Sequence, residues 1–267
     1  MKRFWAIVAV LTAAMLSFAS CDDNTIPIEP DTEEETALCD TCGQNPCVCE
    51  GEPVEAPESS PAIKIDGEFD DWAALDTSKV ATAVCSQLPY KTALKTMKVY
   101  ADSDYISIYF EVDEDEILGE APLDIYINAD NSENEAVELW SNQGGVDYLI
   151  EGFYYVGPTQ GAEPEVCSFD AALYGYLGSE EIFDWLWDPE TAPLVPKGIG
   201  LTSGAGTLSK YELTIVRELL KDVKLSSTFG LGLTVSQEWS PVGVLPNGEV
   251  TDDNPKGAVK FLEVKIN

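Results

Sequence analysis

Short runs of β-branched and aromatic residues recur from residue 61 to residue 267, with glycine, proline, asparagine or aspartate between them. In the clearest run, Tyr105–Val112, side chains alternate with the period of two that is typical of a β-strand. Four apolar side chains of this run fall on one face: Ile106, Ile108, Phe110 and Val112. The pattern therefore predicts a strand that buries this face.

Seven further runs predict strands by the same criteria: Ala62–Ile65, Met97–Tyr100, Leu123–Asn128, Val146–Val156, Tyr211–Val216, Phe229–Val235 and Val259–Ile266. Only short helices are expected, at Asp71–Leu75, Arg217–Val223 and Ser179–Trp187. Many short strands separated by turn residues favour an all-β fold over βαβ units. We therefore expect a two-sheet antiparallel β-sandwich of the jelly-roll type with a few short helices.

Residues 1–20 have the layout of a lipoprotein signal peptide. Lys2 and Arg3 form a positive start, and Phe4–Phe18 is an uncharged apolar run, shorter than the roughly 20 residues that a membrane-spanning helix needs. Small residues then lead into Cys21, whose thiol we expect to carry a diacylglycerol anchor. Ordinary cleavage after Ser20, with Cys21 as a spare thiol, is the alternative.

Residues 21–60 are expected to form an acidic, proline-rich tether that separates the anchor from a domain at residues 61–267. Residues 22–60 hold twelve acidic residues and no lysine or arginine, so they bury too little apolar surface to offset the entropy of ordering. The tether also carries a compact cysteine motif, Cys39, Cys42, Cys47 and Cys49. One zinc ion, two local disulfides or free thiols remain open for these four residues.

The charge and composition exclude several classes of function. The chain holds 15 basic and 48 acidic residues and no histidine. A strongly negative protein repels other polyanions, so nucleic acid and sulfated glycans are poor partners. Without histidine, the chain has no Ser-His-Asp or Cys-His nucleophilic system and no histidine-ligated metal site.

Five segments of residues 61–267 follow one another in an order that resembles a known family. They are Ile63–Trp72 (IKIDGEFDDW), Asp124–Asn131 (DIYINADN), Gly145–Gly152 (GVDYLIEG), Tyr211–Arg217 (YELTIVR) and Gly230–Trp239. This succession resembles the family 9 carbohydrate-binding modules and the wider group of DOMON-like sandwiches. The resemblance implies a sandwich fold and non-catalytic glycan binding, while the binding loops are the part of such a fold that varies.

The same segments have a direct physical interpretation. Asp66 and Gly67 suit a tight turn, Asp70 or Asp71 is expected to cap a short helix, and Trp72 is expected to fold back into the core. Glu212 lies within a strand that is otherwise suited to burial. We expect its carboxylate to face a polar rim or to pair with Lys210 or Arg217. A disulfide between Cys85 and Cys167 stays open, because spacing cannot decide it.

Aromatic side chains beside hydrogen-bonding groups are the chemistry that binds sugar rings, because a pyranose has an apolar face and a hydroxyl edge. The candidate ligand-binding residues are Trp185, Trp187 and Asp184 in a long stretch between predicted strands, Trp140 with Asn142, and Trp239 at a strand end. Each tryptophan is alternatively a core or sheet-edge residue. The expected ligand is a neutral oligosaccharide or polysaccharide.

A structural calcium ion is a second expectation, implied by the family resemblance and by an oxygen-rich turn at Asn128, Asp130 and Asn131. Asn128 stands where relatives often have aspartate, and a solvated acidic turn is the alternative. Together these features predict a non-enzymatic lipoprotein. Asp22 and Asp23 directly follow Cys21, which resembles Bacteroidetes-type lipoproteins, and this resemblance implies attachment to the outer membrane and display on the cell surface. A docking subunit that binds an outer-membrane protein and a glycoside-processing enzyme are the alternatives.

Overall fold

The computed structural model describes residues 59–86, 92–117, 121–132, 145–154, 164–177, 186, 189–203, 208–238, 240–248, 251–253 and 260–267. All of them belong to a compact unit at Val54–Asn267, and a separate unit at Met1–Pro53 lies outside the described residues. The predicted domain boundary after residue 60 stays a prediction. No helix among the described residues is long and apolar enough to cross a membrane.

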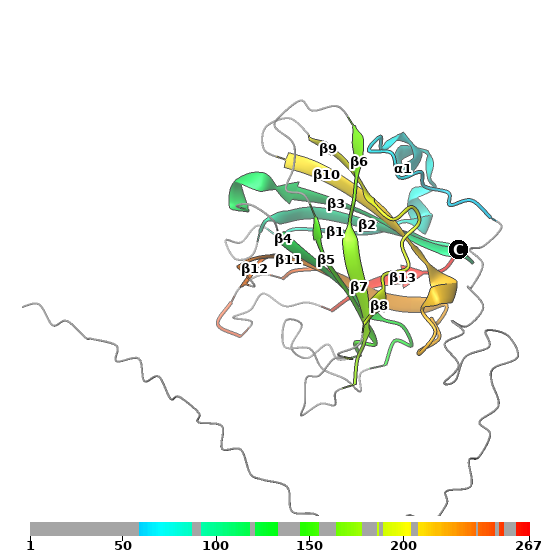
Figure 1. The fold of residues 1–267 in the computed structure, drawn as a ribbon. Helices are drawn as coiled ribbons and strands as arrows, with labels where there is room; N and C mark the ends of the chain where they lie inside the picture. The colour runs from blue at the N-terminus through cyan, green and yellow to red at the C-terminus, as the bar shows by residue number, and fades with distance from the viewer. Residues whose placement is uncertain are drawn as a thin grey trace, which may run out of the picture. The chain divides into compact units, whose positions relative to one another are not determined.

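Two antiparallel sheets face each other, as predicted (Figure 1). The first sheet has the order β1 (Ala81–Val84), β2 (Leu94–Ala101), β3 (Tyr105–Asp113), β10 (Leu208–Val216), β9 (Ile199–Ser203) and β6 (Glu165–Cys167). The second has the order β12 (Ser240–Leu245), β11 (Thr228–Gln237), β4 (Ala121–Asn128), β5 (Tyr148–Tyr154), β7 (Asp170–Gly175) and β8 (Glu190–Thr191), and β13 (Leu262–Lys265) also pairs with β11. The prediction of an all-β sandwich is confirmed.

Helical structure is short, as expected. It consists of α1 (Asp70–Ala74) and 3-10 turns that include Thr77–Lys79, Glu114–Glu116 and Arg217–Leu219. The helix predicted at Arg217–Val223 is thus a single 3-10 turn, which ends before the connection to β11. The helix predicted at Ser179–Trp187 falls almost entirely outside the described residues.

The main core fills the space between the sheets. The predicted face of β3 is completely buried there, together with the inward-facing Leu213 and Ile215 of β10 and Leu231 and Leu233 of β11. Strands β4 and β5 also turn alternate residues into this core. Because side chains alternate across a strand, the other residues of β4 and β5 lie on the outer face of the sheet.

The opposite face of β3 is also buried, which simple alternation did not predict. Tyr105, Ser107 and Tyr109 are all less than 5% exposed. A second apolar cluster lies on this face, where Ile63, Ile65 and Trp72 pack against Tyr109. The N-terminal segment of the domain therefore covers the outer face of the six-stranded sheet.

This N-terminal segment corrects two predictions. Ala62–Ile65 is not a strand, although Ile63 and Ile65 are buried and Lys64 is exposed as the alternation required. The helix α1 begins after Phe69 without a side-chain cap. Instead, the Asp71 carboxylate accepts hydrogen bonds from the backbone N–H of Lys64 at 2.6 Å and of Trp72 at 2.9 Å. It ties the segment to the helix rather than capping the helix.

Glu212 fastens this segment to β10, and the prediction of a rim position or a pair with Lys210 or Arg217 is wrong. The carboxylate is fully buried and accepts hydrogen bonds from the backbone N–H of Asp66 (3.1 Å) and Gly67 (2.9 Å) and from Nε1–H of Trp72 (3.0 Å). Gly67 has φ +78°, and a Cβ there would lie 2.7 Å from the carbonyl oxygen of Leu201. Only glycine therefore fits the close approach of this turn to the sheet.

The first prediction concerns this contact. Glu212→Gln keeps an oxygen for the turn amides but places an amide donor where a carboxylate oxygen accepts from Trp72. We expect a loss of about 1–3 kcal/mol in the free energy of unfolding, the range for a buried group left unsatisfied. Urea unfolding measures this loss.

The pH dependence gives a second measurement on the same variant. Burial raises the pKa of Glu212 from 4.5 to about 7, so between these values the folded state holds a proton that the unfolded state has released. Its contribution to stability is therefore lost as the pH rises through 7. The deficit of Glu212→Gln should narrow between pH 5 and pH 8, whereas Glu190→Gln, at an exposed position of β8, should keep the wild-type slope. An unchanged slope in Glu212→Gln would contradict the assignment.

Candidate functional site

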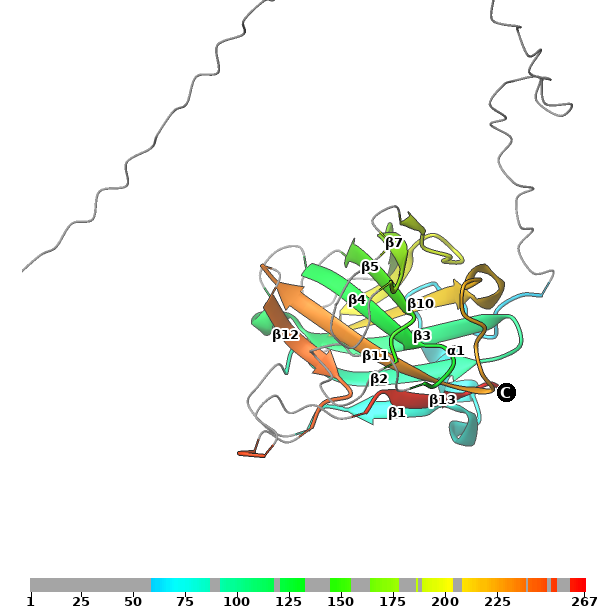
Figure 2. The same ribbon diagram turned by 90° about the horizontal axis from the view of Figure 1, so that it is seen from below.

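The outer face of the seven-stranded sheet carries a group of polar and aromatic side chains, which we call the outer-face cluster: Asp124, Tyr126, Glu151, Phe153 and Tyr174. Strands β4, β5 and β7 lie next to one another in the sheet (Figure 2). Asp124 is the register partner of Glu151, and Leu149 is the register partner of Tyr174. Alternation along the three strands therefore brings the members of the cluster to one side.

An acidic pair stands at the centre of the cluster. Asp124 is 8% exposed, and its carboxyl group hydrogen-bonds with the side chains of Glu151 and Tyr126. Burial, and then the nearby Glu151 carboxylate, raises the pKa of Asp124 to about 8. Burial also raises the pKa of Glu151, and the hydrogen bond with Asp124 opposes that shift. At neutral pH, Asp124 therefore holds a proton that it donates to Glu151, since two adjacent carboxylates do not both ionise in a buried place.

Two polar atoms next to this pair have no hydrogen-bond partner among the described residues. One is Oδ1 of Asp124, and the other is Oγ1 of Thr234 on β11, which is the register partner of Asp124. Thr234 is fully buried. Buried polar atoms are nearly always satisfied by protein or ordered water, so these two atoms leave hydrogen-bonding capacity unused beside the acidic pair.

Aromatic side chains lie on both sides of Glu151. Phe153, two residues along the same face of β5, is 45% exposed. Tyr174 on β7 is near enough for Glu151 to contribute to the rise in its pKa, after burial. The cluster therefore presents an accessible carboxylate between a flat apolar ring and a phenol.

The predicted calcium turn lies at the end of β4, in the same sheet. The Asn128 amide donates to the carbonyl oxygen of Ser132 at 2.9 Å, and Asp130 Oδ1 accepts from the Ser132 backbone N–H at 2.8 Å. The Asp147 carboxylate accepts from the backbone of Ala129 at 2.6 Å and more weakly from that of Asp130. The turn is thus held by the side chains of Asn128, Asp130 and Asp147, and one Asp130 oxygen is already used as an acceptor within it.

Other groups near this turn also bear on calcium. A small cavity of about 90 Å³ lies beside it, and its lining includes Asn128, Asn131 and Glu263 but also Lys260, an ammonium that competes with a cation. Within the described part of the chain, no group of three or more cysteine, aspartate or glutamate side chains is placed to hold a metal. Calcium at Asn128, Asp130 and Asn131 stays a prediction.

The remaining predicted site residues fall outside the described residues. These are Trp140, Asn142, Asp184, Trp185, Trp187 and Trp239, the motif Cys39, Cys42, Cys47 and Cys49, and the anchor Cys21. Cys85 and Cys167 are described, and both are free thiols. Cys85 follows β1 and Cys167 ends β6, at opposite edges of the six-stranded sheet, so the disulfide that spacing left open is not formed.

Sequence reasoning missed the outer-face cluster, although its centre lies in two of the segments that carried the family resemblance. Asp124 opens the segment DIYINADN, and Glu151 is the second-to-last residue of the segment GVDYLIEG. Each carboxylate interrupts an apolar run, which is a usable signal, since a buried strand position rarely holds an acid. The antiparallel register that makes them partners was not visible in the sequence.

Comparison with protein-family models gives no match, and comparison with curated proteins gives no significant match. The argument about function therefore rests on the residues of this chain.

The second prediction concerns the protonated carboxyl. The pKa of Asp124 rises from 3.8 unfolded to about 8 folded, so over this range the folded state binds a proton that the unfolded state has lost. Stability contributed by this group is present below pH 4 and is lost as the pH rises through 8. Asp124→Asn, which imitates the protonated form, should remove that part of the pH dependence.

Urea unfolding at pH 5, 7 and 9 is the measurement. The exposed Asp170 of β7 offers a matched control, and Asp170→Asn should lose stability with pH as the wild type does. If Asp124→Asn declined as steeply as wild type between pH 5 and pH 9, the shared proton would be refuted.

Proposed function

We propose that residues 61–267 bind a neutral oligosaccharide or polysaccharide without chemical change, and that the outer-face cluster is the binding surface. The observation that carries this proposal is an accessible carboxylate, Glu151, held by a protonated Asp124 and placed beside the half-exposed ring of Phe153. Sugar rings need such a combination of flat apolar surface and oriented acceptors.

Each residue has a distinct part in this proposal. Phe153 offers its ring to the C–H face of a pyranose, and Glu151 accepts hydrogen bonds from its hydroxyl groups. Asp124 orients Glu151 from below and limits the charge of the pair to about one. Limiting the charge matters because a neutral ligand gains little from a second carboxylate, whose burial would be costly.

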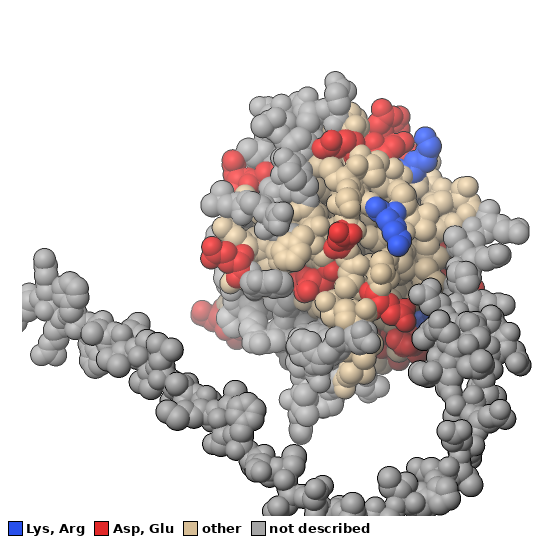
Figure 3. All heavy atoms as spheres, viewed as in Figure 1, with Lys and Arg blue, Asp and Glu red and all other residues tan. Residues whose placement is uncertain are grey.

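The charge of the molecule supports a neutral ligand. The chain has a formal net charge of −33, and acidic side chains are spread over the face shown in Figure 3, where basic ones are few. Such a surface repels sulfated or otherwise polyanionic glycans at moderate ionic strength. The ligand we expect is therefore uncharged over most of its length.

The predicted anchor and tether complete the proposal. We propose that diacylglycerol on Cys21 holds the protein at the outer membrane, on the cell surface, and that the acidic tether lifts the domain away from the lipid. Trp185 and Trp187 remain predicted contributors to the same ligand. Docking to an outer-membrane protein is the second candidate, because Phe153 is an exposed apolar ring that a protein partner would also cover.

The third prediction tests binding. The full chain, purified in mild detergent, should bind a neutral oligosaccharide on a glycan array with a dissociation constant of roughly 10 µM to 1 mM, about −7 to −4 kcal/mol. Phe153→Ala should reduce the free energy of glycan binding by about 1–2 kcal/mol, the usual value of an aromatic contact. Calorimetry measures this reduction. Glu151→Gln should also weaken binding, because it replaces an ionised acceptor.

Two comparisons make the result specific. Val166→Ala removes another exposed apolar side chain, 49% exposed on the other sheet, and should leave affinity unchanged. Trp185→Ala and Trp187→Ala test the sequence prediction separately. Absence of any glycan binding, together with capture of one membrane protein that Phe153→Ala abolishes, would favour docking instead.

The fourth prediction concerns the anchor. Cys21→Ala should move the protein from the membrane fraction to the soluble fraction, because the acyl chains on this residue are the predicted membrane attachment. Fractionation after a salt wash measures the change. Cys85→Ala, which alters a described free thiol, should stay with the membranes; retention of both variants would refute lipidation at Cys21.

A further inference from the structure

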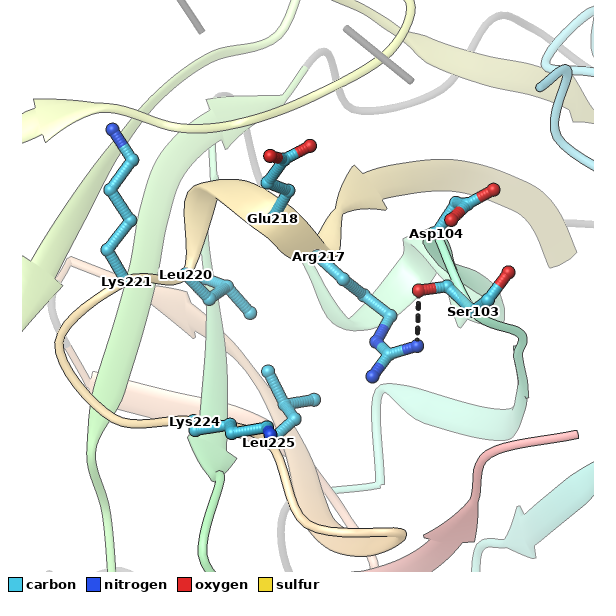
Figure 4. A pocket seen from close by; sticks show the side chains of 8 residues that line it. All are labelled: Ser103, Asp104, Arg217, Glu218, Leu220, Lys221, Lys224 and Leu225. Carbon is cyan, nitrogen blue, oxygen red and sulfur yellow. Dashed lines mark hydrogen bonds between the residues drawn. The ribbon is translucent and has the colours of Figure 1, made fainter. Parts of the chain in front are cut away.

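A cavity of about 400 Å³ lies where β10 ends and the chain turns toward β11, and no residue of the outer-face cluster lines it. Three cations line it: Arg217, Lys221 and Lys224 (Figure 4). Two carboxylates, Asp104 and Glu218, also line it, which leaves the lining with one net positive charge. In a chain of 15 basic and 48 acidic residues, such a local excess of cations is unusual.

The cations of this cavity are not used in ion pairs. The ion pairs of the described residues are Lys64–Asp66 and Lys95–Asp113, and neither involves the cavity. The side chains of Lys221 and Lys224 belong to exposed residues. Arg217 is already acted on by the charges of Asp102 and Asp104, whereas Lys221 and Lys224 make no ion pair among the described residues and can attract an anion from outside.

Arg217 is the most constrained of the three. Its Nη1 donates to the carbonyl oxygen of Asp102 and, at 2.6 Å, to that of Ser103. Its Nε–H is buried and has no hydrogen-bond partner among the described residues. A guanidinium keeps its charge in a protein and presents five donors in a rigid fork, so the group is already oriented and its donors are only partly used.

From this geometry we infer that the cavity binds the carboxylate of an acidic sugar, a uronic acid residue. Arg217 and the two lysines attract the carboxylate. Asp104 and Glu218 accept hydrogen bonds from hydroxyl groups, while the buried Leu220 and Leu225 form an apolar floor between the cations. We assign the carboxylate to a sugar because this inference rests on the proposed glycan function. The cavity itself is a separate site from the outer-face cluster.

A single carboxylate fits better than a phosphate or sulfate cluster. Two carboxylates in the lining, and a net charge of −33 on the whole chain, oppose ligands with several negative charges. A sugar with a single carboxylate can interact with the cations of the cavity and is repelled less by the acidic groups of the protein. The ligand is therefore a mostly neutral glycan that carries occasional uronic acid residues.

The test uses D-glucuronate, D-glucose and acetate as probes on the full chain in low salt, with binding followed by calorimetry. Glucuronate should bind more tightly than glucose or acetate, and its affinity should fall as sodium chloride screens the cations. The double variant Lys221→Gln/Lys224→Gln should weaken glucuronate binding about tenfold, as expected for loss of charge-assisted contacts. Both lysines are exposed, so the variant keeps its fold.

The matched control is Lys79→Gln/Lys197→Gln, which makes the same change in net charge at exposed lysines outside the cavity and should retain wild-type affinity. If both double variants weakened glucuronate binding equally, the effect would come from the net charge of the whole protein, and the proposed site would be overturned. Acetate binding as tightly as glucuronate would overturn the sugar ligand. Binding of a neutral glycan at the outer-face cluster should be unchanged in Lys221→Gln/Lys224→Gln. Failure of the uronic acid site can therefore be distinguished from failure of the proposed neutral-glycan surface.

Discussion

Burial of both faces of a sheet is the constraint on which the rest of this structure depends. A sandwich normally buries the two inner faces and leaves the outer ones to solvent. Here the outer face of β3 and β10 is also closed, because the N-terminal segment packs Ile63, Ile65 and Trp72 against Tyr109. Once that face is closed, any polar group on it needs a partner inside the protein, and Glu212 receives three donors from the segment itself.

Glu212 also explains why a short stretch without a sheet partner keeps a defined position. Its donors lie 140 to 146 residues earlier in the chain, so the contact is formed only when the domain is complete. A typical hydrogen bond contributes about 0.5–1.5 kcal/mol net, so three of them are a noticeable share of the roughly 5–15 kcal/mol by which a typical domain is stable. The segment that leads from the predicted tether is therefore held at a single buried acid.

The sequence predicted the fold class and most long strands because period-two alternation is a local property. It extended Ala62–Ile65 into a strand because alternation also arises in an irregular segment that buries every second residue, as Ile63 and Ile65 do. It missed the short strands β9 and β6. Strand β9 is defined by its pairing with β10, and β6 by its pairing with β9. The candidate site could not be predicted, because strand pairing is not a local property of the sequence. Asp124 and Glu151 are 27 positions apart and become neighbours only through the register of β4 and β5.

The two buried carboxylates, Glu212 and Asp124, differ in how far the chain satisfies their oxygens. Glu212 has a donor for each oxygen, and all of its partners belong to the chain. Asp124 has an orphan oxygen beside the orphan hydroxyl of Thr234 and shares its proton with the more accessible Glu151. Burial raises the pKa of both acids, so a shifted pKa alone does not identify a site. What separates them is the unused hydrogen-bonding capacity of Asp124 and Thr234 near the half-exposed ring of Phe153, and the proposed binding surface rests on that difference.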